Sequence, residues 1–585
     1  MAGLTGLVSP SAPPVELGDR LDRVVRAGPG STAVEDERIS LTYEEFWNVA
    51  HGLALELASA PPGSILLSMD RSVEGVVAYW AAFLAGRRVT PVSPSWPASR
   101  RAALARAVEA TCALVASSGA AGTEPGTTEL ESVGLEVSVA LDVSVALDRL
   151  RGRRPPQPVL DGAPGRADAY VLFTSGSTGR PKGVRISRYA LTAYVEVACQ
   201  NTGLRAGDRV SHNIDYTFDP SIFDVFVAVS SGATICVPHR SERLRPVAFV
   251  TRARLSHWCS VPSLIGLADR LGSLTPAAMP TLRHSMFFGE ALLRSDAQRW
   301  RRAAPSSVLA NAYGPTELTN TCSEYRVDVG AEIPETSNGT VPIGGCYPGL
   351  DWGLLDVSAS SSEAGSAADL SELAGLACGA KGELVVRGAQ RLTSYLAVED
   401  NAQRFAEWVP RADPAGSPQA GGWRSIDVAP VSDEADGVPD ELAYRTGDLV
   451  EVTAEGLVHL GRIDRQVKVR GQRVEPAEVE HLLREILAVS RVAVFPERQG
   501  METRLAAVVE VDAGPLPGST REVDQDGEFW RADPWPAAPP IAELRRQLPA
   551  HLIPARWVAL SRFPSNARRK IDLERLREMA AVEPR

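Results

Sequence analysis

The sequence predicts an α/β fold, in which helices flank a largely parallel sheet, in a chain of at least two domains. Segments of strand and helix character alternate near the start: residues 39–46 read as a strand leading into a helix, and an apolar helix over 76–84 precedes a short strand at 89–92. Another apolar strand, at 170–173, runs into a glycine-rich turn. The 585 residues exceed what one ordinary hydrophobic core holds, so a second domain is expected.

The composition is that of a soluble globular enzyme, with 44% hydrophobic and 23% charged residues. A formal net charge of −11 argues against a dedicated nucleic-acid binder, which usually needs a basic face. The seven cysteines include no CxxC pair, a pattern typical of reduced thiols in the cytoplasm. Residues 1–21 hold no basic residue before Arg20 and no long apolar run, so neither a secretory signal nor a membrane helix is expected.

The first helix carries a clear start signal. Thr42 is placed to act as its N-cap, Glu45 completes a capping box three residues on, and helical periodicity then runs to about Leu57. The apolar helix over 76–84 is expected to stop at Gly86.

Three later segments are interpreted as surface insertions. The hexapeptide Val-Ser-Val-Ala-Leu-Asp occurs in tandem at 137–142 and 143–148, and two copies are too few for a solenoid, so we expect a local duplication in a surface excursion. Residues 359–380 and 413–440 are rich in small, polar and turn-forming residues, and we expect both to be loop insertions.

Residues 170–184 carry a strong chemical signal, because an apolar strand enters a turn crowded with glycine and hydroxyl residues and a lysine follows. Freed backbone N–H groups, hydroxyls and the lysine charge can together wrap a polyphosphate. The alternative is a flexible surface loop, although a bare linker rarely follows a strand and ends in Pro-Lys-Gly. The turn is not a Walker loop, because its hydroxyl residues precede the lysine. The candidate phosphate-binding residues are Thr174, Ser175, Gly176, Ser177, Thr178, Gly179 and Lys182.

This segment resembles the phosphate loop of adenylate-forming enzymes, namely acyl-CoA synthetases, luciferases and the adenylation domains of nonribosomal peptide synthetases. The resemblance runs from about Leu41 to Leu576, and its motifs follow in the family's order: Phe-Asp-Pro-Ser at 218–221, Asn-Ala-Tyr-Gly-Pro-Thr-Glu at 311–317, Tyr-Arg-Thr-Gly-Asp-Leu at 444–449 and Gly-Arg-Ile-Asp-Arg at 461–465. It implies a large N-terminal domain (1–463) of helix-flanked mixed or parallel sheets plus β-structure. A small, mobile α+β C-terminal domain (464–585) would turn about a hinge at Asp464.

The resemblance also implies a nucleotide site for ATP. An aromatic residue at a strand end, a glycine turn and a carboxylate can stack a purine and hold a hydrated cation, although such a motif can also be a simple turn. By resemblance Tyr313 would lie against adenine, Asn311 would bond its exocyclic amine, Glu317 would contact Mg²⁺ and Asp448 would accept the ribose hydroxyls. The implied ATP-binding residues outside the phosphate loop are Gly289, Glu290, Asn311, Ala312, Tyr313, Gly314, Thr316, Asp448 and Arg462.

Asp219 has two interpretations. A carboxylate between an aromatic residue and a proline, at the head of an apolar stretch, can simply cap a helix. In amino-acid-activating members of the family, the carboxylate at this position pairs with the α-ammonium group of the substrate. The resemblance therefore favours an amino acid as the substrate.

Lys570 is the implied catalytic lysine. It stands six positions after Pro564 and is followed by Ile-Asp, as in the family's terminal motif, but Arg568-Arg569 replace the usual Asn-Gly. The alternative is a basic surface turn. Together with Thr174 and Lys182, Lys570 would neutralise charge on the reacting phosphate.

The resemblance implies an acyl pocket lined by Asp219, Pro220, Phe223, Ser260, Met286, Phe288, Ala312, Asn320, Thr321 and Lys570. Because Phe288 is large, we expect a short cavity and a small amino acid. The expected activity is that of an amino-acid adenylating ligase, which forms aminoacyl-AMP with release of pyrophosphate and then loads the phosphopantetheine thiol of a separate carrier protein in natural-product biosynthesis. The alternatives are an acyl- or aryl-CoA ligase, a ligase for a β-amino acid or an aminoacyl-carrier substrate, and a non-catalytic binding module.

Overall fold

The computed structural model describes residues 15–116, 139–155, 165–176, 180–356, 378–411, 420–426, 437–499, 502–511, 518–524, 527–535, 537–564 and 571–580. The chain divides into two compact units. The first comprises Met1–Pro94, Leu104–Leu172 and Gly183–Ile463, and the second comprises Ser95–Ala103, Phe173–Lys182 and Asp464–Arg585. In the described part of the chain, no helix combines the length and the apolar character that a membrane crossing requires.

A nine-stranded mixed sheet dominates the first unit. In spatial order its strands are β15 (Gly345–Cys346), β14 (Ser323–Val327), β13 (Val308–Tyr313), β12 (His284–Phe287), β11 (His257–Ser260), β9 (Arg209–Ser211), β10 (Thr234–Cys236), β1 (Thr32–Glu35) and β2 (Ser40–Thr42). The strands from β13 through β1 run parallel, whereas β2, β14 and β15 run antiparallel to their neighbours. This arrangement confirms the predicted α/β class.

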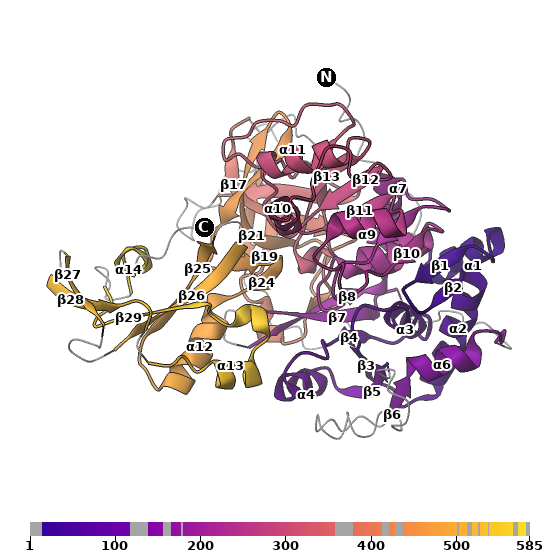
Figure 1. Ribbon diagram of the computed structural model, residues 1–585, viewed down its shortest axis with the longest axis horizontal. Coiled ribbons are helices and arrows are strands. Elements are labelled where there is room, and N and C mark those ends of the chain that lie inside the picture. Colours follow the sequence, from indigo (N-terminus) through magenta and orange to yellow (C-terminus); the bar gives the residue numbers. More distant parts are fainter. Residues whose placement is uncertain are drawn as a thin grey trace. The chain divides into compact units, whose positions relative to one another are not determined.

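Helices α9 (Pro246–Ala253), α10 (Ser263–Arg270) and α11 (Arg294–Ala303) pack beside β11 to β13 (Figure 1). Trp258, Phe287 and Trp300 join side chains of these helices in one apolar cluster. Successive side chains of a strand point to opposite faces. Met286 and Phe288, the residues on either side of Phe287, accordingly point to the other face and belong to the main core of the unit.

A second, seven-stranded sheet carries the glycine-rich turn. Its spatial order is β18 (Ser394–Tyr395), β8 (Lys182–Ser187), β7 (Asp168–Thr174), β4 (Val89–Pro91), β3 (Ser64–Ser68), β5 (Ala110–Val115) and β6 (Val139–Asp142). The unit also contains α1 (Leu17–Ala27), α2 (Tyr43–Ser59), α3 (Val73–Leu84), α6 (Val143–Leu150), α7 (Arg188–Thr202), α8 (Ala228–Ser230), the π-helix η1 (Phe223–Val227) and the 3₁₀ turns η2 (Thr316–Leu318) and η3 (Val398–Asn401), while α4 (Ala98–Ala107) crosses the unit boundary.

The predicted helix signals are confirmed. Thr42 is the N-cap of α2, its side chain accepts from the backbone of Glu45, and the Glu45 carboxylate accepts from the backbone of Thr42, which completes the capping box. Every residue of α3 is buried, as expected for a helix that is apolar all round. The helix ends at Leu84, and Gly86 follows with a φ of +67°.

The surface-excursion interpretation of the duplicated hexapeptide is wrong for residues 139–148. The first copy supplies β6, which pairs in parallel with β5 at the edge of the sheet. The second copy opens α6, where Asp142 caps the helix and Val143, Ala146 and Leu147 are buried. The same six letters therefore form a strand and then a helix, because the neighbouring strand and the core decide which conformation buries their apolar side chains.

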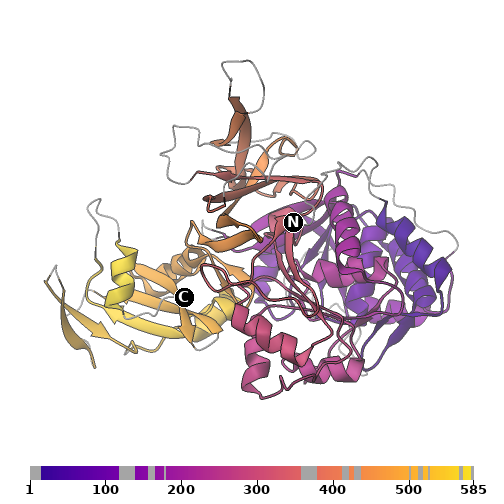
Figure 2. The same ribbon diagram turned by 90° about the horizontal axis from the view of Figure 1, so that it is seen from above.

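A third, antiparallel sheet completes the first unit. It is built from β16 (Leu350–Leu355), β17 (Lys381–Gly388), β21 (Ala443–Thr453), β19 (Phe405–Arg411) and β20 (Ala420–Ile426), with β22 (Gly456–Arg462) paired to β21. Figure 2 shows its strands projecting from the helix-flanked sheets of this unit. The loop prediction for 413–440 is wrong at β20, which pairs with β19 along seven residues. Most of 359–380 lies outside the described residues.

The second unit holds the C-terminal α+β elements. A five-stranded sheet has the order β25 (Val492–Gln499), β26 (Glu502–Glu510), β29 (Arg556–Leu560), β28 (Gly527–Ala532) and β27 (Thr520–Asp524), and a hairpin joins β23 (Val467–Val469) to β24 (Gln472–Val474). Its helices are α12 (Pro476–Leu487), α13 (Ile541–Gln547) and α14 (Leu573–Met579), with a 3₁₀ turn η4 (Ala550–Leu552). The amphipathic helix expected after Glu475 is α12, with Pro476 in its first turn.

Two buried histidines make the stability of this fold sensitive to acid. The rings of His257 and His284 stack with centroids 5.6 Å apart, and burial lowers their pKa values to about 4 and about 3. Neither ring nitrogen of His284 has a hydrogen-bond partner among the described residues. In the unfolded chain both groups titrate near pH 6.5. Below that pH the unfolded state therefore binds more protons than the native state.

We expect the free energy of unfolding to fall as the pH drops from 7 to 5, with each histidine contributing up to about 2 kcal/mol of that loss. Urea denaturation at both pH values measures it. His284→Leu removes one of the two groups, so the difference between pH 7 and pH 5 should shrink relative to the wild type. An unchanged difference in the variant would show that His284 is not the source.

Candidate active site

Asp219 lies in a buried turn that leads into a π-helix. The backbone N–H groups of Ser221 and Ile222 donate to the carbonyls of Phe218 and Asp219, and η1 begins at Phe223. Only 4% of Asp219 is exposed. Ile222, not Asp219, stands at the N-cap position of η1. The turn therefore buries a carboxylate beside an element of a type that often marks functional sites.

A buried hydrogen-bond chain ties this turn to the end of β9. Nδ1 of His212 lies 3.0 Å from a carboxylate oxygen of Asp224, and its Nε2 lies 3.1 Å from the hydroxyl of Tyr216. That hydroxyl also donates to the carbonyl of Ser72. Burial raises the pKa of Asp224, and the hydrogen bond to His212 opposes the shift. The sequence reasoning missed this pair, whose only signal was two ionisable residues in an apolar stretch.

Four apolar residues predicted to line the pocket lie in the main core of the first unit. Met286 and Ala312 lie on the same face of adjacent parallel strands, because Met286 is in register with Ala310. With Phe223 and Phe288 they belong to the main core cluster. The structure thus buries all four side chains in the main hydrophobic core of the first unit.

Ser260 faces differently. Its hydroxyl accepts a hydrogen bond from the Trp258 indole, at 2.9 Å, and donates to the carbonyl of Val261. Trp258 belongs to the cluster under α9 to α11, on the sheet face opposite Met286. The structure therefore does not group the Ser260 side chain with the apolar set.

The turn after β13 carries Asn320 and Thr321. A Cβ added at Gly314 would lie 2.4 Å from the Asn320 carbonyl oxygen and 2.6 Å from Cα of Thr321, so only glycine allows this close approach. Thr319 and Asn320 both have positive φ values, of +55° and +74°. Gln390 holds the strained segment, because its side-chain amide donates to the carbonyl of Thr321 and its own carbonyl accepts from the Thr319 hydroxyl.

The side chains of Asn320 and Thr321 are fixed by two phenols. The Asn320 amide donates to the Tyr194 hydroxyl at 2.6 Å, and the Thr321 hydroxyl lies 3.0 Å from that of Tyr347. Burial raises the pKa of Tyr194, and the charge of Asp219 adds to the shift. Tyr194 therefore links the Asn320 turn electrostatically to the carboxylate of the Asp219 turn.

Asp448 is the centre of a charged hydrogen-bond group. The Tyr313 hydroxyl donates to one carboxylate oxygen at 2.6 Å, whereas Arg462 donates to the other at 3.0 Å. His459, which the sequence reasoning missed, lies 3.0 Å from that second oxygen, and its ring centroid is 6.0 Å from that of Tyr313. The Asp448↔Arg462 pairing of β21 with β22 sets this geometry. Three residues predicted to bind the nucleotide thus meet at one carboxylate.

Two more residues predicted to contact the nucleotide are oriented by backbone groups. The Asn311 side-chain amide donates to the carbonyls of Val341 and Pro342, at 2.9 and 2.8 Å. Its oxygen is then the group suited to accept from an exocyclic amine. A carboxylate oxygen of Glu290 accepts from the backbone N–H of Ser263 at the start of α10, and Gly289 precedes it with a φ of +81°.

Glu317 is fully buried in η2. The Tyr395 hydroxyl donates to its carboxylate at 2.6 Å and lies 3.2 Å from the hydroxyl of Tyr444. The Glu317 carbonyl accepts from the backbone of Leu392 at 2.7 Å. A carboxylate fixed in this way offers the oxygen donor that Mg²⁺ prefers.

The described part of the phosphate loop belongs to the second unit. A Cβ added at Gly176 would lie 1.9 Å from the Arg180 carbonyl oxygen, so this turn requires glycine. The Thr174 hydroxyl is buried and has no hydrogen-bond partner in the described part of the chain, and Lys182 is 5% exposed. The Ser175 hydroxyl donates to the carbonyl of Arg473 and accepts from the backbone N–H of Glu475, both at 2.9 Å.

The remaining predicted residues are placed as follows. Ser177, Thr178, Gly179 and Lys570 lie outside the described residues. Asp464 begins the C-terminal part of the second unit and accepts from the backbone of Gln466. Pro220 and Thr316 are buried in the turns that carry Asp219 and Glu317.

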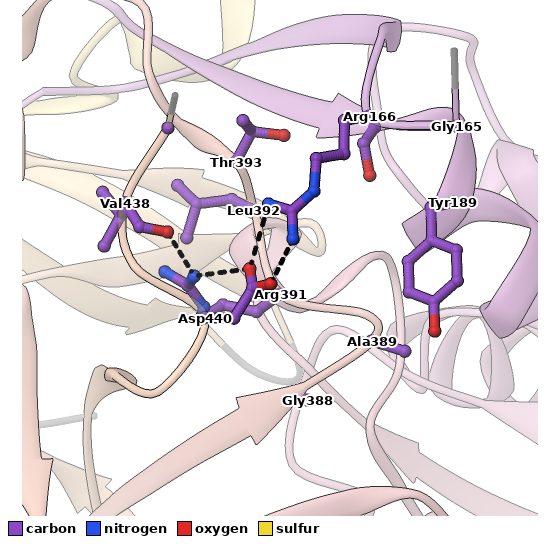
Figure 3. A pocket seen from close by; sticks show the side chains of 12 residues that line it. Gly165, Arg166, Tyr189, Gly388, Ala389, Arg391, Leu392, Thr393, Val438 and Asp440 are labelled. Carbon is purple, nitrogen blue, oxygen red and sulfur yellow. Dashed lines mark hydrogen bonds and ion pairs between the residues drawn. The ribbon is translucent and has the colours of Figure 1, made fainter. Parts of the chain in front are cut away.

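A cavity of about 590 Å³ in the first unit is lined by none of the predicted residues. Figure 3 shows Arg166 and Arg391 approaching Asp440 from two sides of this cavity. Arg391 also donates to the carbonyls of Val438 and Pro439, which fastens residues 437–440 to the sheet. Asp440 is 69% exposed, so its ion pairs add little stability.

Comparison with known proteins gives the family. The family model described as AMP-binding enzyme matches residues 21–396. The chain is 29% identical over 583 residues to the nonribosomal peptide synthetase inpB of Emericella nidulans, with 98% of this chain covered but only 22% of the relative. It is 30% identical over 572 residues to an L-proline–[L-prolyl-carrier protein] ligase of Pseudomonas fluorescens, with 95% and 97% of the two chains covered.

The fold agrees with a solved structure, the Vibrio cholerae adenylation domain AlmE in complex with glycyl-adenosine-5′-phosphate. The TM-score is 0.75 at 24% identity, and the match covers 99% of this chain and 100% of that one. The family match confirms the family that the motifs predicted. The chain belongs to the AMP-binding enzyme family of adenylate-forming enzymes.

Proposed function

We propose that this protein activates a small amino acid with ATP, forming aminoacyl-AMP and pyrophosphate, and then loads the phosphopantetheine thiol of a separate carrier protein. The family uses ATP, and the Pseudomonas fluorescens relative is an L-proline–[L-prolyl-carrier protein] ligase. The chain spans only 22% of the length of the Emericella nidulans relative, so the activity of the whole protein is part of this proposal.

The observation that carries the proposal is the buried carboxylate of Asp219. It is 4% exposed and lies in the turn that leads directly to Phe223 of the apolar cluster. By resemblance, the carboxylate at this position pairs with the α-ammonium group of an amino acid, through a charge-assisted hydrogen bond. A fatty or aryl acid carries no ammonium group, so a buried carboxylate here favours an amino acid as the substrate.

Activation would begin with attack of the substrate carboxylate on the α-phosphorus of ATP. Lys570, Lys182 and the Thr174 hydroxyl, which has no hydrogen-bond partner among the described residues, would stabilise the oxygen charge that accumulates. Tyr313, Asn311 and Asp448 would hold the adenosine, and Glu317 would hold the Mg²⁺ that shields the phosphates.

The thioester step would use a carrier protein supplied in trans. Rotation about Asp464 would exchange Lys570 for the segment that begins at Lys468, so that a pantetheine arm can reach the mixed anhydride. We place this reaction in the cytoplasm.

Amino-acid-dependent ATP–pyrophosphate exchange tests the proposal. A panel of the twenty standard amino acids and several β-amino acids should reveal one preferred substrate. The competing acyl- or aryl-CoA ligase would instead consume free coenzyme A and show no stimulation by any amino acid. A flat response across the panel would refute amino-acid activation.

A further inference from the structure

We propose that the preferred amino acid carries a hydroxyl group on a short side chain, as serine and threonine do. This inference rests on the proposed function and goes beyond it by naming the substrate class. The inference is based on the side chain of Asn320, whose amide oxygen has no hydrogen-bond partner in the part of the chain that the structure describes.

Asn320 is 1% exposed, and its amide nitrogen donates to the Tyr194 hydroxyl at 2.6 Å. The amide oxygen is buried, and it has no hydrogen-bond partner among the described residues. A buried polar atom without a partner is costly, and most such atoms in native proteins are satisfied. The strained backbone at +74° adds to that cost, which points to a ligand role for this residue.

The other two neutral polar side chains predicted for the pocket are already satisfied. The Ser260 hydroxyl both accepts from Trp258 and donates to the backbone of Val261. The Thr321 hydroxyl pairs with that of Tyr347. Of these three side chains, Asn320 alone keeps an open hydrogen-bonding position within the described chain.

A hydroxyl matches the open position in either orientation of the Asn320 amide. With the nitrogen on Tyr194, the substrate hydroxyl donates to the amide oxygen; with the amide reversed, the hydroxyl accepts from the nitrogen. A methyl group satisfies neither arrangement. Phe223, Met286 and Phe288, which the resemblance places in the pocket, are large apolar side chains of the main core, so the side chain that carries the hydroxyl should be short.

The test compares isosteric substrate pairs in ATP–pyrophosphate exchange with the intact protein. We expect kcat/KM for serine to exceed that for alanine, and that for threonine to exceed that for valine, by at least about tenfold, because the apolar partner leaves the amide unpaired. Alanine equal to or better than serine overturns the inference while leaving amino-acid activation intact. If no amino acid stimulates exchange, the proposed function itself is overturned.

Two variants locate the preference. Asn320→Leu removes the amide and should bring the serine-to-alanine ratio close to one. Tyr194→Phe removes only the hydroxyl that orients the amide and should lower the ratio by several-fold. The matched control is Tyr325→Phe, whose hydroxyl bonds Glu455 on the opposite face of the sheet, and it should keep the wild-type ratio. A ratio that survives both Asn320→Leu and Tyr194→Phe overturns the assignment to Asn320.

Discussion

Replacing Asp219 with alanine is expected to lower kcat/KM for amino-acid-dependent exchange by a hundredfold to a thousandfold. The carboxylate is 4% exposed, so the proposed pairing with the substrate ammonium would take place away from water. Removing one member of such a buried pair typically costs about 3–5 kcal/mol, and each 1.4 kcal/mol is about tenfold in rate. Exchange kinetics with the preferred amino acid measure the loss.

Two controls separate ammonium recognition from general damage. Asp440→Ala removes a carboxylate that is 69% exposed and should change kcat/KM by less than about threefold. ATP affinity, measured by calorimetry, should remain near the wild-type value in Asp219→Ala. Full activity of Asp219→Ala with the preferred amino acid would contradict the proposed role and favour the acyl- or aryl-CoA ligase.

Replacing Lys570 with alanine is expected to lower adenylation by about a hundredfold or more, because one fixed cation facing the developing charge supplies a few kcal/mol. Lysine suits this role better than a titrating base, since it stays charged while bridging carboxylate and phosphate. Single-turnover formation of aminoacyl-AMP measures the effect without the later thioester step.

The two preceding residues provide a matched control for Lys570. Arg568 and Arg569 stand directly before it and carry the same charge. If the segment were only a basic surface turn, alanine at any of the three positions would have a similar, small effect. A loss confined to Lys570→Ala supports the catalytic role, and equal losses at all three positions would refute it.

The fold class was predictable because strand–helix alternation and capping are local signals. Thr42 and Glu45 lie three residues apart, and their capping box forms as expected. The duplicated hexapeptide shows the opposite case, since identical local sequence becomes β6 in one copy and α6 in the next. Its conformation depends on pairing with β5 and on burial in the core, which the letters themselves do not contain.

The motifs of the candidate site were predictable, but the contacts between residues outside those motifs were not. Asp448 and Tyr313 stand in recognisable motifs, whereas His459 joins them only through the pairing of β21 with β22. His212 and Asp224 likewise meet across a turn that no motif marks. Such partners depend on strand register and burial, which a single sequence encodes only weakly.

The Ser175 hydroxyl in the predicted phosphate loop can donate one hydrogen bond, and it donates that bond to the carbonyl of Arg473. A phosphate oxygen can accept a hydrogen bond from this hydroxyl only if the bond to the Arg473 carbonyl breaks. Phosphate bound in the predicted loop would therefore compete with the carbonyl of Arg473 for the same donor, and its binding would weaken the attachment of residues 473–475 to the loop.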